Sequence, residues 1–154
     1  MIEQQIKEHA IAFLEPILAQ ENAYLVDFII RREGKRYVLT ALLDTDTGVS
    51  IEQCARISRQ LGLQLESQNV IDASYRLEVS SPGIDQPLRM LRQFPKVINR
   101  DFLVTRMSGT AKESFTGKLK EVRGTLLVFE NAVGGDTMEL EYDSVLEVRE
   151  KLPW

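Results

Sequence analysis

The stretch from Leu77 to Leu88, Leu-Glu-Val-Ser-Ser-Pro-Gly-Ile-Asp-Gln-Pro-Leu, restricts the backbone more than any other part of this chain. Apolar and charged side chains alternate over residues 75–79, which predicts a half-buried strand. Pro82 presets its own φ and Gly83 permits a positive φ, so the strand must end there. We therefore expect a stiff joint between two domains, residues 1–82 and 83–154. It lies within residues 81–88 and includes Ser81, Pro82, Gly83, Asp85 and Pro87.

Periodicity in the first domain predicts the element order α-β-β-α-β. Apolar residues recur at helical spacing over residues 2–20, with Pro16 expected to kink that helix or restart a turn. Alternating residues predict strands at 24–31, 37–43 and 74–80, the first with Tyr24, Val26, Phe28 and Ile30 on one face. Ser50 and Gln53 have the spacing of a capping box before a helix over 51–66. These elements predict a small α/β sandwich with both helices on one face of the sheet.

The second domain is predicted to be almost entirely β. After a short helical piece within 88–98, which Pro95 limits, candidate strands lie near 101–107, 114–122, 125–130, 136–142 and 144–149. Five short strands in so few residues favour a small closed barrel, because closure removes exposed sheet edges. The predicted fold class is therefore α+β.

The net charge of −4 conceals a strong segregation of charge along the chain. Residues 1–82 carry eight Lys and Arg against twelve Asp and Glu, residues 86–123 carry nine against three, and residues 124–154 carry two against seven. Acidic surfaces attract basic proteins, whereas a basic surface can contact phosphate. The alternative is that these charges only solvate the surface. Candidate contacts to a basic protein are Glu52, Glu66, Asp72, Glu139, Glu141 and Glu147; candidate RNA contacts are Arg89, Arg92, Lys96, Arg100, Lys118 and Lys120.

Two aromatic residues, Phe94 and Phe102, interleave with the basic cluster, which also contains Arg106. Aromatic rings among cations can stack on RNA bases. We favour the alternative, in which both rings enter the core of the second domain.

No catalytic constellation is visible in the sequence. His9 is the single histidine and Cys54 the single cysteine, and Cys54 falls on the apolar stripe of the second helix, where we expect a small buried hydrophobe. The Asp44–Gly48 segment superficially resembles a calcium loop but lacks the required glycine and the bidentate glutamate. The Pro82–Asp85 segment lacks the glycines and the Gly-Lys-Ser/Thr ending of a phosphate loop, so we expect Asp85 to cap a turn. We predict no enzyme, metal or cofactor.

Several segments resemble the RimP family of bacterial ribosome maturation factors. The closest is Leu77–Leu88, supported by Val49–Ser58, Phe115–Leu119 and Glu141–Val145; Gln86 stands where the family usually has Arg, and Asn99 where it often has Gly. The resemblance implies an N-terminal α/β domain and a C-terminal SH3-like, Sm-related barrel. It also implies a cytoplasmic, non-enzymatic assembly factor.

The partners that the resemblance implies are the immature small ribosomal subunit, its very basic ribosomal protein S-twelve and nearby rRNA. No apolar run approaches the roughly 18–20 residues that span a bilayer, so we expect no membrane partner. We also expect the protein to be a monomer. A stand-alone Sm-like RNA-binding module is the alternative function.

Overall fold

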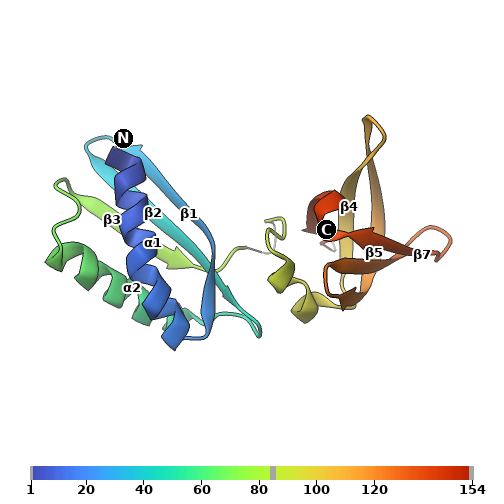
Figure 1. The fold of residues 1–154 in the computed structure, drawn as a ribbon, viewed down its shortest axis with the longest axis horizontal. Coiled ribbons are helices and arrows are strands. Elements are labelled where there is room, and N and C mark those ends of the chain that lie inside the picture. The colour runs from blue at the N-terminus through green and yellow to red at the C-terminus, as the bar shows by residue number, and fades with distance from the viewer. Residues whose placement is uncertain (1, 84–85, 153–154) are drawn as a thin grey trace. The chain divides into compact units, whose positions relative to one another are not determined.

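The computed structural model describes residues 2–83 and 86–152, and the chain divides into two compact units, residues 1–82 and 83–154 (Figure 1). Each unit has its own hydrophobic core. None of the helices in the described ranges is long and apolar enough to cross a membrane.

The N-terminal unit has the predicted order of elements. They are α1 (Ile2–Gln20), β1 (Ala23–Glu33), β2 (Arg36–Thr45), α2 (Ile51–Ser67) and β3 (Tyr75–Ser80). The capping box is confirmed: the Gln53 backbone N–H donates to Ser50 Oγ at 3.1 Å, and the Ser50 N–H donates to Gln53 Oε1 at 3.1 Å. Pro16 does not end α1, because the helix continues to Gln20 and its residues Leu14, Ile17 and Leu18, on either side of Pro16, are buried.

The three strands form one sheet in the order β1-β2-β3, with β1 antiparallel and β3 parallel to β2. Both helices cover one face of this sheet (Figure 1), as predicted, and the core lies between the layers. Leu14 from α1, Leu61 from α2 and Leu39 from β2 are completely buried there. Burial of such side chains contributes about 1.5–3 kcal/mol each, so this core holds the two helices on the sheet.

The predicted alternation of β1 is wrong at its beginning. A bulge between Leu25 and Asp27 shifts the register, so Leu25 pairs with Leu43 and Phe28 pairs with Ala41. Leu25 and Phe28 therefore both pack against the core, although strict alternation put them on opposite faces. The extra residue of the bulge, Val26, is what the period-two pattern could not reveal.

The C-terminal unit contains every strand that the sequence predicts. They are β4 (Asp101–Ser108), β5 (Ala111–Arg123), β6 (Leu126–Asn131), β7 (Thr137–Glu141) and β8 (Val145–Glu150). The helical piece before them is two 3-10 turns, η1 (Leu91–Gln93) and η2 (Pro95–Val97), and a third, η3 (Tyr142–Ser144), joins β7 to β8. Phe102, Leu119 and Phe129 lie in the core of this unit.

The sheet of the C-terminal unit has the order β7-β6-β5-β4-β8, with all neighbours antiparallel. A closed barrel also requires pairing between β7 and β8, and among the described residues no ladder joins them. The α+β class is thus confirmed, but barrel closure is not. Register shifts at Thr105/Arg106 and Leu119/Glu121 bend the strands, which lets the sheet cover its own core without a helix layer.

Candidate functional site

The candidate basic residues nearest the joint lie on the segment that enters the C-terminal unit. Arg89 and Arg92 are exposed and Lys96 is half-buried. The Gln93 amide, only 3% exposed, fixes this segment, since its Oε1 accepts the N–H of Arg89 at 2.8 Å and of Met90 at 3.0 Å. The Tyr142 hydroxyl donates to the Arg89 carbonyl at 2.8 Å. Arg89 is therefore presented on a rigid backbone.

The other candidate basic residues are held by carboxylates on neighbouring strands. Arg100 Nη1 lies 3.3 Å from Glu150, Lys118 Nζ lies 3.4 Å from Asp101, and Lys120 Nζ lies 3.8 Å from Glu130. These pairs are exposed, so each contributes little to stability and can exchange with another anion. A phosphate would have to displace a carboxylate to bind here.

Neither aromatic residue of the basic cluster is available for stacking. Phe94 and Phe102 are 0% and 1% exposed, as we favoured, and the Phe94 ring meets the Tyr142 ring edge-on with centroids 5.9 Å apart. Any RNA contact in this region must therefore come from charge and hydrogen bonding rather than from these two rings.

The backbone conformation at position 99 explains why an Asn can stand there. Its φ is +78°, in the left-handed region where Gly and Asn are the residues most easily accommodated. Its N–H donates to the Leu119 carbonyl at 2.7 Å, and its own carbonyl accepts from Lys118 Nζ at 3.2 Å. Asn99 can thus replace a glycine here without changing the turn that positions Lys118.

The acidic candidates of the N-terminal unit lie around helix α2. Glu52 is in its first turn, Glu66 is in its last turn and Asp72 is in the loop before β3, and all three are exposed. Within the described residues none of the three forms an ion pair. Their charges are therefore directed to solvent or to a partner.

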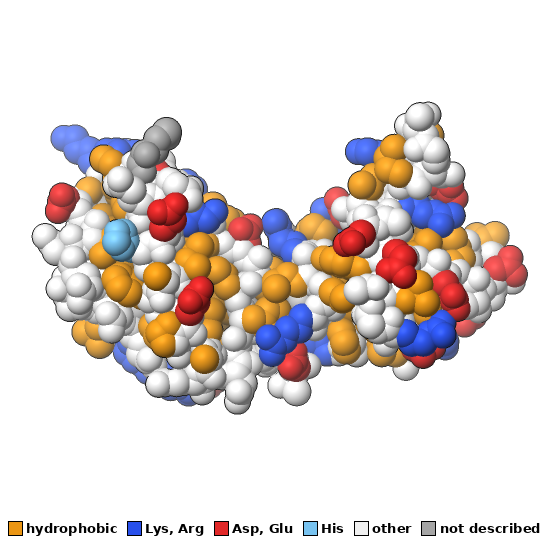
Figure 2. All heavy atoms as spheres, in the orientation of Figure 1, with side chains coloured by type: hydrophobic (Ala, Val, Ile, Leu, Met, Phe, Trp, Pro, Cys, Tyr) orange, Lys and Arg blue, Asp and Glu red, His pale blue; other side chains and the backbone are white. Residues whose placement is uncertain are grey.

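The acidic candidates of the C-terminal unit are largely compensated. Glu139 lies 2.6 Å from Arg123 and Glu147 lies 3.0 Å from Arg149, while Glu141 accepts a hydrogen bond from Thr125 Oγ1 at 2.8 Å. Glu139 and Glu141 lie on β7 and Glu147 on β8, the two outer strands of this sheet. Figure 2 shows the resulting mixture of positive and negative side chains over this unit.

The joint is described only in part. Ser81 and Gly83 are exposed, Pro82 and Pro87 are half-buried, and Asp85 lies outside the described residues, as does its predicted capping role. The positive φ expected for Gly83 stays a prediction.

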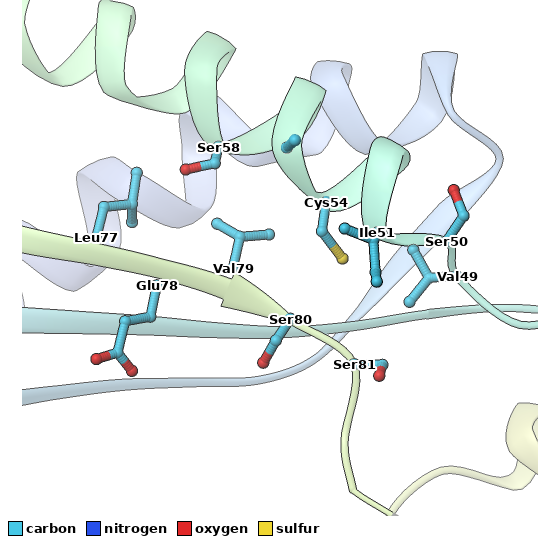
Figure 3. Close-up of a pocket in the computed structure, with 11 residues that line it drawn as sticks. Val49, Ser50, Ile51, Cys54, Ser58, Leu77, Glu78, Val79, Ser80 and Ser81 are labelled. Carbon is cyan, nitrogen blue, oxygen red and sulfur yellow. The ribbon is translucent and has the colours of Figure 1, made fainter.

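A groove that the sequence did not reveal lies between α2 and β3. It has a volume of about 540 Å³, and Ile51, Cys54, Ser58, Leu77 and Val79 are among the residues that line it (Figure 3). Cys54 is buried, as predicted, and burial raises the pKa of its thiol. Glu78 is the one charged residue among the described residues that line the groove.

His9 is exposed on α1, with its ring 6.4 Å from that of Phe13. Across the described residues, no cluster of three or more His, Cys, Asp or Glu side chains is arranged to hold a metal ion. The described residues form a two-unit α+β protein that carries charged side chains on the surface of both units.

Comparison with known families identifies the N-terminal unit. Residues 13–85 match the family model of the RimP N-terminal domain, which covers most of that unit. This segment is thus a RimP N-terminal domain, the domain of a family of ribosome maturation factors.

Proposed function

We propose that this protein is a non-enzymatic assembly factor that binds the immature small ribosomal subunit in the cytoplasm and leaves when the subunit is mature. The observation that carries this proposal is the match of residues 13–85 to the RimP N-terminal domain. Its mechanism is to hold a ribosomal protein and a nearby rRNA segment in a productive geometry during assembly.

The protein partner in this proposal is a very basic small-subunit protein, with S-twelve as the candidate. Support comes from the exposed carboxylates of Glu52, Glu66 and Asp72. None of them forms an ion pair within the described residues, although Arg56 is near enough to Glu52 to interact with it electrostatically. Uncompensated charge of one sign accelerates encounter with a partner of the opposite sign. The tail carboxylates Glu139, Glu141 and Glu147 are the second candidate contact.

The rRNA contact in this proposal uses the C-terminal unit. Arg89, Arg92, Lys96, Arg100, Lys118 and Lys120 are its candidate phosphate contacts. The antiparallel five-stranded sheet, with η3 between its last two strands, is compatible with an SH3-like, Sm-related barrel. Such contacts position a protein on RNA without reading its sequence.

Sedimentation of a cell lysate tests the proposal. The tagged full-length protein should co-sediment with free or immature small subunits and little with complete ribosomes. Recovery only in ribosome-free fractions at low salt would contradict it. Repeating the gradient at higher ionic strength should reduce the bound fraction, because exposed charges are screened.

The alternative function is a stand-alone Sm-like RNA-binding module, which the β-rich C-terminal unit makes reasonable. A pulldown on RNA from a ribosome-free extract separates the two: the module would recover RNA there, whereas the assembly factor requires the subunit.

A further inference from the structure

The sheet of the N-terminal unit ends at β3 with one edge open. β3 pairs with β2 over residues Tyr75 to Ser80 without a register shift, and within the described residues no strand pairs with its other edge. The Tyr37 N–H donates to the Ser74 carbonyl at 3.1 Å, which sets the hydrogen-bonding phase of the parallel pair. Because N–H directions alternate along a strand, the N–H groups of Tyr75, Leu77 and Val79 face away from β2. This edge is a template for another strand.

The groove beside this edge has room for the side chains of such a strand. Leu77 and Val79 point from β3 towards α2, as Figure 3 shows. The helix contributes small side chains opposite them, including Cys54, Ala55 and Ser58. Ile51 at the mouth is 86% exposed, an unusual position for a large apolar side chain at the start of a helix.

The opposite edge of the same sheet also borders a groove, of about 310 Å³ between α1 and β1, but its strand is less regular. β1 carries the bulge between Leu25 and Asp27, and a bulge interrupts the regular row of groups that a new strand needs. The two edges therefore differ in their capacity to accept a strand, and β3 is the receptive one.

Charge indicates the kind of segment that fits. Glu78 is the only charged residue among the described lining residues, and Glu52 is exposed immediately after Ile51 at the mouth. The unit that contains them carries eight Lys and Arg against twelve Asp and Glu. Glu78 already pairs with Arg76 of the same strand at 2.8 Å. Because opposite charges on facing strands stabilise a sheet, a Lys or Arg of the added strand would share that carboxylate.

We propose that the outer edge of β3 binds an extended segment of a basic protein as a fourth strand. Apolar side chains of that segment enter the groove against Leu77 and Val79, its backbone pairs with the outward N–H groups of β3, and its Lys or Arg side chains face Glu78. This inference rests on the proposed function, since it assigns the protein contact of the assembly factor to one place.

Hydrogen exchange and a groove-filling variant test the proposal on the full chain, with purified immature small subunits as the probe. Binding should slow exchange of the Tyr75, Leu77 and Val79 amides, because they become hydrogen-bonded. Ala55→Phe places a ring in the groove and should weaken binding about tenfold or more, the effect of losing even one or two kcal/mol of strand pairing. The matched control is Leu63→Phe, which adds a ring at a 67% exposed position of the same helix and should bind like the original chain.

The outcomes separate the inference from the proposed function. If the original chain does not bind small subunits, the assembly function fails. If it binds and Ala55→Phe binds equally well, with no protection of β3, the strand contact is overturned. Circular dichroism and the exchange pattern of Ala55→Phe confirm that it is folded; should it not fold, Ser58→Phe replaces it.

Two further results would also overturn the proposed strand contact. Protection of β3 by deproteinised rRNA alone would assign the edge to RNA. A halving of the molecular mass on introducing Ala55→Phe would assign it to a second copy of this chain.

Discussion

The two units treat their charges differently. In the C-terminal unit, charged side chains of adjacent strands form ion pairs, among them Lys118 with Asp101 and Arg123 with Glu139. The N-terminal unit also contains ion pairs, such as Arg56 with Glu21 and Arg76 with Glu78, but Glu52, Glu66 and Asp72 form none with any described residue. The strongly basic count of residues 86–123 is thus largely neutralised in space, whereas the acidic excess of the first unit is not. Net charge per segment is therefore a poor measure of what a partner meets.

The cores of the two units are also built differently, and the space around one glycine in each unit shows the difference. In the C-terminal unit the strands cover one another, and a Cβ on Gly117 would lie 3.2 Å from the Glu130 carbonyl oxygen and 3.3 Å from Phe129 Cβ. In the N-terminal unit two helices form a separate layer, and a Cβ on Gly62 in α2 would meet nothing within 4 Å. Close strand packing requires glycine in one unit, and the helix layer does not require it in the other.

The largest effect is expected for Gly117→Val. The added side chain meets backbone on the neighbouring strand, which cannot move without breaking the β5–β6 ladder, so the C-terminal unit should lose about 3 kcal/mol of unfolding free energy. Denaturant unfolding followed by NMR signals from each unit measures this. Because each core is separate, signals from the N-terminal unit should unfold at their original denaturant concentration. A simultaneous shift of both units would contradict that independence.

Reversing the charge of the candidate carboxylates in each unit compares the contributions of the two units to binding. The triple change Glu52→Lys, Glu66→Lys and Asp72→Lys should weaken binding to small subunits about tenfold to a hundredfold at low salt, from roughly 0.5–1 kcal/mol for each exposed charge. The matched triple Glu139→Lys, Glu141→Lys and Glu147→Lys should have a smaller effect, because Glu139 already pairs with Arg123 and Glu147 with Arg149.

Titrations at two ionic strengths provide the measurement for both triples, and the difference between them should shrink at high salt. Equal losses for the two triples at low salt would show that ion pairing within the C-terminal unit does not matter for recognition.

A smaller effect of opposite sign is expected for Gly62→Ala. Gly62 lies within α2, its φ is not positive, and the space for a methyl group is open. Replacing a helical glycine by alanine should therefore stabilise the N-terminal unit by about 0.5–1 kcal/mol. Thermal unfolding of this unit measures it, and a loss of stability would mean that the glycine has a packing role in α2.

The smallest expected effect concerns the ion pair between Glu21 and Arg56. Arg56 hydrogen-bonds the Glu21 carboxylate at 2.9 and 3.0 Å and lowers the pKa of that carboxyl below the ordinary value of 4.5. Because the pKa of Glu21 is lowered in the folded state, the ion pair's contribution to stability is complete above pH 4.5 and is lost as the pH falls through the lowered pKa.

An NMR titration of the Glu21 carboxyl in the original chain and in Arg56→Gln checks this. The variant should titrate at higher pH and lose less stability on acidification. An unchanged titration would show that Arg56 is not the cause.

Local patterns in the sequence were sufficient for much of the fold. The capping box at Ser50 and Gln53 and the apolar stripe of α2 depend on residues that are close in the chain, and both were predicted from it. The bulge at Val26 was missed, because one extra residue in a strand changes no local composition. Barrel closure was inferred from strand number, which does not determine whether the outer strands pair.

The candidate site was harder to predict than the fold. Ion pairs such as Arg100 with Glu150 join residues fifty positions apart, so counting charges along the chain could not show which ones are neutralised. The groove depends on small side chains of α2 facing an open strand edge, and neither signal is distinctive alone. The sequence analysis did not identify Gln93 as the buried side chain that fixes the backbone of its segment. Its place between the apolar residues Leu91 and Phe94 is the one feature of the sequence that could have indicated its burial.

The hydrogen bonds that close the C-terminal unit bear on the order in which the protein can be made. Its first strand, β4, pairs with its last, β8, and the Leu88 N–H donates to the Val148 carbonyl at 2.8 Å. During synthesis this unit cannot complete its sheet until residues near its end have left the ribosome. The N-terminal unit needs nothing beyond β3, so it can fold while the rest is still being translated. A chain that ends at residue 123 therefore has a complete N-terminal unit, whereas its β4 and β5 strands still lack their second partners, β8 and β6.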